Sequence, residues 1–134
     1  MQSRFFTKVL MCVLLCGLGA VAAPAATTNY KGKTSQKRNI KFSIAGKSLT
    51  HLRFSIVLAC SDGSTLTDDE SDFRAIPITS KGTFSDKQFG DTDQVTVKGT
   101  RKGTKVTGTL RVTDKLNASV KCGPRTVKFT AKRG

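Results

Sequence analysis

Three kinds of side chain in this 134-residue sequence could support chemistry: a pair of cysteines, one histidine and a cluster of carboxylates. His51 is the single histidine, and it lies beside Leu52 in a segment with the composition of a strand. A catalytic triad needs a histidine base that a carboxylate orients beside a nucleophile, and no such pattern surrounds His51. We therefore expect no catalytic residue and no enzymatic activity.

Four of the nine acidic residues form one cluster, Asp68, Asp69, Glu70 and Asp72. Their oxygens could bind a calcium ion, but their spacing matches no calcium-loop motif. We predict a solvated acidic loop over residues 65–72. Two cysteines and one histidine cannot complete a four-ligand zinc site, so we expect no metal and no cofactor.

Basic residues gather in three stretches, residues 31–41, 98–105 and 121–133. In the last stretch, Lys128 and Lys132 alternate with threonines, which places them on the outward face of a strand. If this strand pairs with the hairpin at Arg101, the basic residues form one positive sheet face; the alternative is an ordinary solvated surface. The residues that we predict to bind an anionic ligand are Lys98, Arg101, Lys102, Lys105, Lys128 and Lys132.

The first 25 residues have the pattern of a secretory signal peptide. Arg4 and Lys8 precede an apolar stretch of about fourteen residues, and small residues suited to cleavage follow it. The apolar stretch is shorter than the roughly twenty residues that span a membrane, so an uncleaved anchor is the weaker interpretation. We predict cleavage after Ala22 or Ala25 and a secreted, extracellular protein with no membrane span after processing.

Cleavage would remove Cys12 and Cys16 and leave Cys60 and Cys122. An even pair of cysteines in an exported chain predicts a disulfide, and two free thiols or a metal site are the alternatives. The remaining chain would carry 21 basic residues against 9 acidic ones, a net charge near +12. Such a charge attracts polyanions, although it could also serve only to keep the protein soluble.

After residue 36 the sequence alternates between apolar and polar residues in short segments, separated by turns that contain glycine. No window has the apolar spacing of an amphipathic helix. We predict an all-β protein, an antiparallel β-sandwich of about seven to nine short strands with one disulfide; a jelly roll or a barrel is the alternative. The predicted organisation is a signal peptide over 1–25, a flexible lead-in over 26–36 and one sandwich domain over 37–134. Within the lead-in, a first short strand over residues 30–34 is the alternative.

Short motifs follow one another in order along this domain. They are Tyr30-x-Gly32-x-Thr34, Ile40-x-Phe42, Cys60-x-x-Gly63, Gly82-x-Phe84, Gly99, Gly108-x-Leu110, Cys122-Gly123 and Phe129-x-Ala131-x-Arg133. This order, which covers nearly the whole processed chain, resembles a group of uncharacterised secreted bacterial β-sandwich proteins. The resemblance implies export, a β fold and the cysteine pair, and it implies no activity.

We therefore expect a secreted, non-catalytic binding or cell-envelope-associated domain. Its predicted partner is an anionic cell-wall or extracellular polymer bound through the basic sheet face. The alternative is a protein-interaction module, such as an inhibitor or adhesin, whose partner is another secreted protein. We expect no specific recognition of nucleic acid, because single strands bind to aromatic platforms and the sequence has no tryptophan and one tyrosine.

Overall fold

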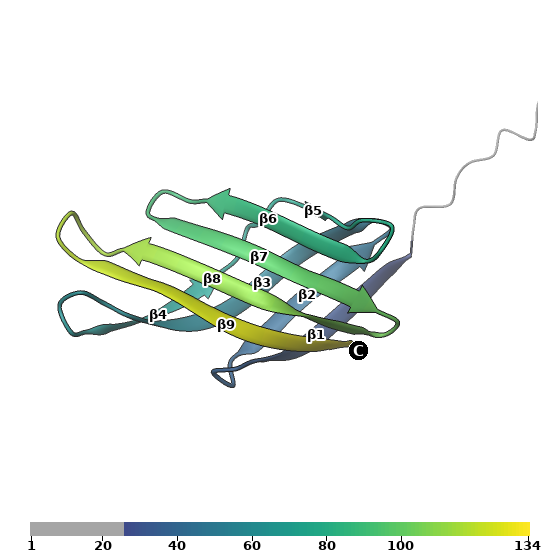
Figure 1. The fold of residues 1–134 in the computed structure, drawn as a ribbon, viewed down its shortest axis with the longest axis horizontal. Helices are drawn as coiled ribbons and strands as arrows, with labels where there is room; N and C mark the ends of the chain where they lie inside the picture. The colour runs from purple at the N-terminus through teal and green to yellow at the C-terminus, as the bar shows by residue number, and fades with distance from the viewer. Residues whose placement is uncertain (1–25) are drawn as a thin grey trace, which may run out of the picture.

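The structure is a computed structural model that describes residues 26–134. Nine β-strands form one antiparallel sheet, which curls over so that its two halves face each other like the layers of a sandwich (Figure 1). One disulfide joins Cys60 to Cys122. The predicted all-β class, with seven to nine strands and a single disulfide, is confirmed. The predicted signal peptide lies outside the described residues.

Eight strands follow one another across the sheet in the order β4-β3-β2-β1-β9-β8-β7-β6, and the short β5 pairs with β3. Strands β6 to β9 form one layer, and β1 to β4 form the other and cross behind them at an angle (Figure 1). The bounds are β1 Thr27–Thr34, β2 Asn39–Ala45, β3 Ser48–Ala59, β4 Thr65–Glu70, β5 Ile76–Pro77, β6 Thr83–Phe89, β7 Asp93–Lys102, β8 Lys105–Lys115 and β9 Lys121–Arg133.

The core lies between the two layers because apolar residues alternate with polar ones along most strands. In β8, for example, Val106 and Leu110 are buried, whereas Thr107 and Arg111 are exposed. Successive side chains of a strand point to opposite faces, so one face of the sheet supplies the core and the other meets solvent. The outward face is consequently rich in threonine, lysine and arginine.

Aromatic side chains fill the core beside the junction of the two layers. The ring of Tyr30 stacks on that of Phe42 with a centroid distance of 5.2 Å, and Phe42 meets Phe129 edge-on at 6.3 Å. Both arrangements suit the quadrupoles of aromatic rings. These three residues come from β1, β2 and β9, so the rings fasten the first and last strands to the same core.

The two layers join where β1 pairs with β9, and this pairing depends on Gly32. Gly32 lies opposite Ala131, and a Cβ atom at Gly32 would lie only 1.8 Å from the backbone oxygen of Thr130. No larger residue fits that space without moving the backbone. A glycine within a strand often marks such a close approach of two backbones.

A β-bulge interrupts β3 at His51. The register passes from Lys41 opposite Arg53 to Ser43 opposite Thr50, so two residues of β3 face the single residue Phe42 of β2. His51 adopts the left-handed conformation, with φ of 53°. Bulges of this kind increase the local twist of the sheet.

The segment between β4 and β6 covers the open side of the sandwich. The side chain of Gln88 on β6 accepts a hydrogen bond from the Arg74 backbone N–H at 2.8 Å and donates one to the Arg74 carbonyl at 3.1 Å. The Phe73 ring stacks on Phe54 of β3 at 5.7 Å. The segment therefore links the two ends of the curled sheet, although β4 and β6 do not pair with each other.

Three sequence predictions need correction. Residues 26–36 are not a flexible lead-in, because Thr27–Thr34 form β1 at the centre of the sheet. The predicted acidic loop over 65–72 is largely strand, since Thr65–Glu70 form β4. The alternation pattern also predicts that Gly123-Pro124 stops a strand that begins at Val120 and separates it from a final strand. Instead, β9 continues through a bulge there, and this bulge accommodates a proline without loss of the ladder on either side.

Candidate functional site

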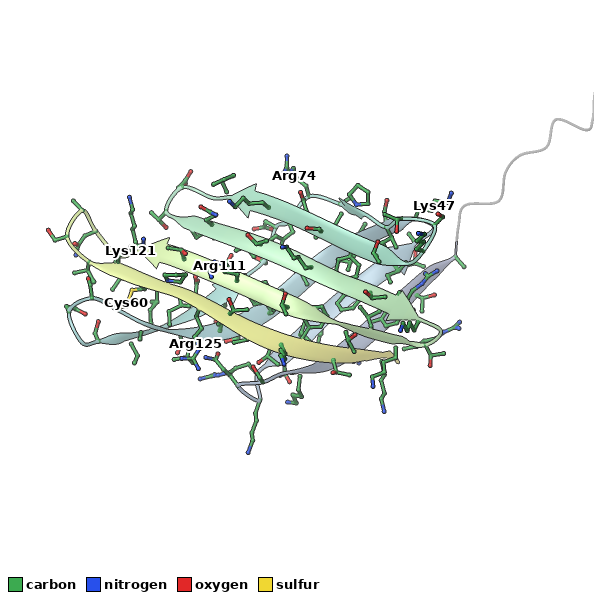
Figure 2. All side chains as sticks on the ribbon, in the orientation of Figure 1. Lys47, Cys60, Arg74, Arg111, Lys121 and Arg125 are labelled. Atoms are coloured by element: carbon green, nitrogen blue, oxygen red, sulfur yellow. A yellow bond between two sulfur atoms is a disulfide. The ribbon has the colours of Figure 1, made fainter. Side chains whose placement is uncertain are left out.

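The disulfide lies at one end of the sandwich (Figure 2). Cys60 follows the last residue of β3, Cys122 lies near the start of β9, and both are buried. The backbone N–H of Ser61 also donates a hydrogen bond to the Lys121 carbonyl, at 2.8 Å. The predicted bond is thus confirmed, and it joins one layer to the other at the end where the turns after β3, β6 and β8 lie.

The structure brings five of the six predicted anion-binding residues onto one outward face. The last strand pairs with the hairpin around Arg101, as the sequence suggested: Lys102 lies opposite Lys105, and Lys105 lies opposite Lys132. Lys98 and Lys128 form a second group farther along the strands, one on each side of Thr109.

Arg101 does not belong to this face. Arg101 is four residues after the buried Val97, so alternation along β7 places it on the inward face of the sheet. It lies near the end of the strand, however, and its side chain is exposed. The residue is therefore near the cations of the hairpin without being in line with them.

The row of cations continues across the junction of the layers. Lys132 lies opposite Lys31, Lys31 opposite Lys41, and Lys41 opposite Arg53. Every member of the row is exposed. We call these six residues the cationic belt; in order across β7, β8, β9, β1, β2 and β3 they are Lys102, Lys105, Lys132, Lys31, Lys41 and Arg53. Neighbouring strands are about 4.8 Å apart, so the belt spans about 24 Å of the outer surface.

Half of the belt could not be identified from the sequence. Lys31 and Lys41 stood in a basic stretch, but aligning them with Lys132 requires the strand order β2-β1-β9. Arg53 gave a weaker signal, as an exposed charge in the otherwise largely apolar segment that became β3. These three residues extend the predicted patch into a continuous track.

Shallow hollows adjoin the part of the belt on β1, β2 and β3. One of about 390 Å³ is lined by Lys31, Gly32, Lys33, Asn39 and Lys41, together with Ile40. Two others, of about 170 and 460 Å³, also have Lys41 in their walls, and the larger includes Arg53. The surface around this part of the belt is therefore uneven, and polar side chains line the hollows beside its cations.

The belt has like charges directly opposite each other, an arrangement that destabilises a sheet. Lys132 takes part in two such pairs, so Lys132→Gln is expected to raise the free energy of unfolding by about 0.5–1 kcal/mol at low salt. The gain should shrink at high salt, because salt screens exposed charges. Urea unfolding at two salt concentrations measures both effects. Lys81→Gln, in the turn before β6, is the control, and an equal gain there would mean that net charge rather than the row is responsible.

Apart from Asp69 and Glu70, which share one hollow with Lys41 and Arg53, no acidic residue lines the hollows beside the belt. All nine acidic residues lie between Asp62 and Asp114, and four of them point inward between the layers: Asp68 and Glu70 on β4, Asp93 on β7 and Asp114 on β8. We call these four the acidic cluster. Glu70 has only 8% of its surface exposed, and Oδ2 of Asp68 is buried without a hydrogen-bond partner.

Burial is the main cause of perturbed titration in the acidic cluster. It raises the pKa of Glu70 to about 9, and the neighbouring carboxyl groups of Asp68 and Asp93 act in the same direction. Burial also raises the pKa of Asp68, with repulsion from Asp114 and Asp93 adding to it. At neutral pH, Glu70 therefore holds a proton in the folded protein.

This proton makes stability depend on pH in an unusual direction. Between about pH 4.5 and 9 the folded protein holds a proton on Glu70 that the unfolded chain releases, so stability is expected to fall as pH rises through this range. One such proton gives a slope of at most about 1.4 kcal/mol per pH unit. Glu70→Gln should flatten the profile measured by thermal unfolding at pH 5, 7 and 9. Asp69→Asn, on the outward face of the same strand, should leave it sloping.

His51 lies apart from any carboxylate cluster. Its side chain is exposed at the bulge, and Nδ1 lies 3.1 Å from the hydroxyl of Thr50. It borders the smallest hollow beside Lys31 and Lys41, so its position is peripheral to the belt.

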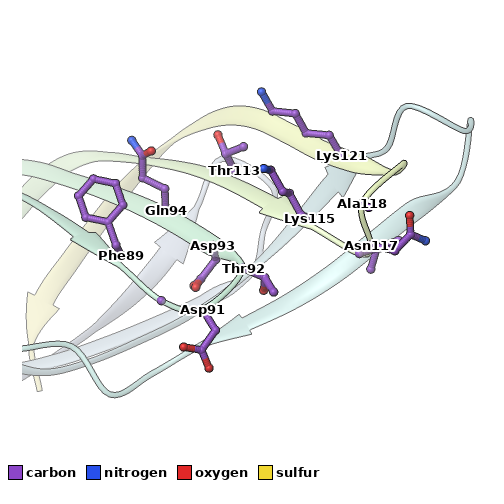
Figure 3. Close-up of a pocket in the computed structure, with 12 residues that line it drawn as sticks. Phe89, Asp91, Thr92, Asp93, Gln94, Thr113, Lys115, Asn117, Ala118 and Lys121 are labelled. Carbon is purple, nitrogen blue, oxygen red and sulfur yellow. The ribbon is translucent and has the colours of Figure 1, made fainter.

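A separate open hollow of about 580 Å³ lies among the turns at the disulfide end (Figure 3). It contains the two large apolar side chains that are exposed in the described part of the chain, Phe89 at 71% and Leu116 at 48%. The residues that line it carry both signs of charge: Asp91 and Asp93 are acidic, and Lys115 and Lys121 are basic. The structure places Phe89, the last residue of β6, on the surface.

No family model, curated protein or solved structure matches this chain. Within residues 26–134, no group of three or more His, Cys, Asp or Glu side chains is arranged to hold a metal ion. The same part of the chain contains no helix that is long and apolar enough to cross a membrane. The fold and the site thus define an all-β domain with one disulfide and a belt of cations across its outer face.

Proposed function

We propose that this protein is a secreted, non-catalytic binding or cell-envelope-associated domain that holds anionic polymers on its outer sheet face. The observation that carries the proposal is the cationic belt, in which six strands each present one exposed cation opposite the next. Such a row opposes the stability of the sheet. A bound polyanion would relieve that repulsion, so ligand binding and stability are linked.

The distribution of charge supports the same proposal. The acidic residues are confined to residues 62–114, and the belt contains none. Its last member, Arg53, borders a hollow that also includes Asp69, which marks where the positive track ends. A surface of one sign attracts an oppositely charged polymer over a distance of about a Debye length and accelerates its encounter.

Soluble polyacrylate tests this proposal, because it is a carboxylate polymer without sugar hydroxyls or bases. We expect the triple variant Lys31→Gln, Lys41→Gln, Lys132→Gln to bind it at least tenfold more weakly than the parent protein at low salt. The slope of log affinity against log salt should fall in magnitude by about two to three, since each lost cation contributes about 0.7–0.9 for a polyanion such as nucleic acid.

The matched control is the triple variant Lys47→Gln, Lys81→Gln, Lys115→Gln, whose three lysines lie off the belt and whose net charge is the same. It should bind polyacrylate nearly as well as the parent protein. Equal weakening in both triple variants would contradict the proposal, because binding would then depend on net charge and not on the belt.

Secretion is the second part of the proposal, and the disulfide supports it because such bonds persist in oxidising compartments. Intact mass of the protein recovered outside the cell provides the test. We expect a chain that starts at Ala23 or Ala26 and is two hydrogens lighter than its reduced form. A full-length mass, with residues 1–25 retained, would contradict processing.

A protein-interaction module is a second candidate, favoured by the exposure of Phe89 and Leu116 in one hollow. Exposed aromatic side chains are common anchors of protein interfaces. If this candidate holds, one stoichiometric partner from the surrounding medium should be captured by the parent protein and lost in Phe89→Ser. The belt triple variant should still capture it.

A further inference from the structure

The cationic belt runs across the strands and not along them. Positive side chains follow one another without interruption across the strands, from Lys102 to Arg53. Along a single strand the next outward position is usually uncharged, as with Thr107 after Lys105 and Thr130 before Lys132. A linear polyanion would therefore meet the most cations by lying across the strands.

The spacing of the belt selects the density of charge on its ligand. One cation is presented per strand, and strands are about 4.8 Å apart. A polymer that carries one acidic group on each unit of about this length has as many acidic groups as the belt has cations over the same distance. A 1→4-linked pyranose is a unit of this size, so a chain of uronic acids has the matching repeat.

A row of hydroxyl groups runs parallel to the belt. It consists of the outward residues two positions away, and each lies directly opposite the next: Thr83, Thr100, Thr107 and Thr130. The row continues with Lys33 and Asn39, which are joined by a hydrogen bond from Lys33 Nζ to Asn39 Oδ1 of 2.5 Å. A threonine hydroxyl both donates and accepts, so this row can bond to sugar hydroxyls while the belt holds the carboxylates.

Aromatic side chains are missing from both rows. Tyr30 and Phe129, on strands that the belt crosses, point inward and are buried, and the exposed Phe89 lies at the far end of β6. Single-stranded nucleic acids are held by bases stacked on exposed aromatic rings. The surface thus suits a hydroxyl-rich chain better than one with bases.

We propose that the belt binds a polyuronate, an acidic polysaccharide with one carboxylate per sugar, extended across the strands with its hydroxyls toward the threonine row. This inference rests on the proposed function and names the ligand class for the same surface. Two expectations distinguish it from general polyanion binding. The six strands of the belt limit the number of sugar units that can be bound, and hydrogen bonds to the sugar hydroxyls add to the affinity that charge provides.

Oligogalacturonates of two to twelve units test the bound length by titration calorimetry with the purified protein. Affinity is expected to rise with each unit up to about six, one per strand of the belt, and then to level off. Continued growth to twelve units, at the same increment per unit, would overturn the alignment across the strands.

The double variant Thr107→Val, Thr130→Val tests the hydroxyl row, since valine keeps the branched shape and strand preference of threonine. We expect affinity for the six-unit oligogalacturonate to fall at least fivefold, about what one neutral hydrogen bond contributes. Affinity for polyacrylate should stay within twofold, and circular dichroism should show an unchanged fold. If the double variant kept the parent protein's affinity for both ligands, the inference that the threonine row binds sugar hydroxyls would be overturned.

Two further probes distinguish failure of the polyuronate assignment from failure of the proposed function. A glycerol phosphate polymer or oligo-dT that binds more tightly than oligogalacturonate of equal charge would overturn the polyuronate assignment and leave the proposed function standing. If no polyanion distinguishes the belt triple variant from the off-belt triple variant, both the inference and the proposed function fail.

Discussion

Replacing Cys60 and Cys122 by serine is expected to lower the free energy of unfolding by about 4 kcal/mol. The disulfide closes a loop with a sequence separation of 62 residues, and restricting a loop of this size in the unfolded chain gives that magnitude in the chain-entropy model. A domain of this length is typically stable by only 5–15 kcal/mol, so the double variant should be marginal near body temperature. Urea unfolding of the oxidised protein and of the variant measures the difference.

A reducing agent provides the internal control for this prediction. It should destabilise the parent protein by a similar amount and leave the Cys60→Ser, Cys122→Ser variant unchanged. A loss below about 1 kcal/mol would mean that the contacts between the layers, rather than the covalent link, hold the disulfide end together.

Gly32→Ala is expected to cost at least about 3 kcal/mol and to disturb the belt at the same time. The new methyl group would overlap the backbone oxygen of Thr130, and overpacking of this severity exceeds the usual range of small-to-large substitutions. Relief requires β1 and β9 to separate, which moves Lys31 away from Lys132. Thermal unfolding should show the loss of stability, and polyacrylate binding at a temperature where the variant is folded should show the loss of affinity.

Gly103→Ala serves as the comparison. Gly103 lies in the β7–β8 turn with φ of 59°, and a Cβ atom there would meet nothing within 4 Å. Its substitution should cost only the roughly 1–2 kcal/mol of a left-handed alanine. If Gly32→Ala were no more harmful than Gly103→Ala, the close approach of β1 and β9 would not be the feature that joins the layers.

The strands that alternation identified are those whose inward residues are large and apolar, such as β2 with Ile40 and Phe42. Two strands were harder to predict because their inward positions break that pattern: β1 was indicated only as a possible short strand over residues 30–34, and β4 was predicted as a loop. In β1 the small Gly32 faces inward between Tyr30 and Thr34, and in β4 the inward positions include acidic residues. Alternation of apolar and polar residues identifies a strand by its apolar inward face. It fails where the inward positions hold a glycine at a close approach of two backbones, as in β1, or buried carboxyl groups, as in β4.

The candidate site was predictable to the extent that it is local. Lys102 and Lys105 flank one turn, and their pairing with Lys132 followed from placing the last strand beside the hairpin. The remaining half depends on β1 lying between β2 and β9, which is a long-range property of the fold. The raised pKa of Glu70 is also beyond local patterning, because it arises from burial against a layer that is distant in sequence.

The central pairing of β1 with β9 also bears on how the chain reaches its folded state. The two halves of the sheet are hydrogen-bonded to each other through the first and last strands, and the Gly134 backbone N–H donates to the Asn29 carbonyl at 3.0 Å. Contacts of such long sequence separation form slowly, since closing the intervening loop costs entropy first. The sheet therefore cannot be completed until the final strand is available. Until residues 121–133 are present, no strand pairing within the described residues joins β1–β4 to β6–β8, so the cationic belt is complete only once β9 has paired with both β1 and β8.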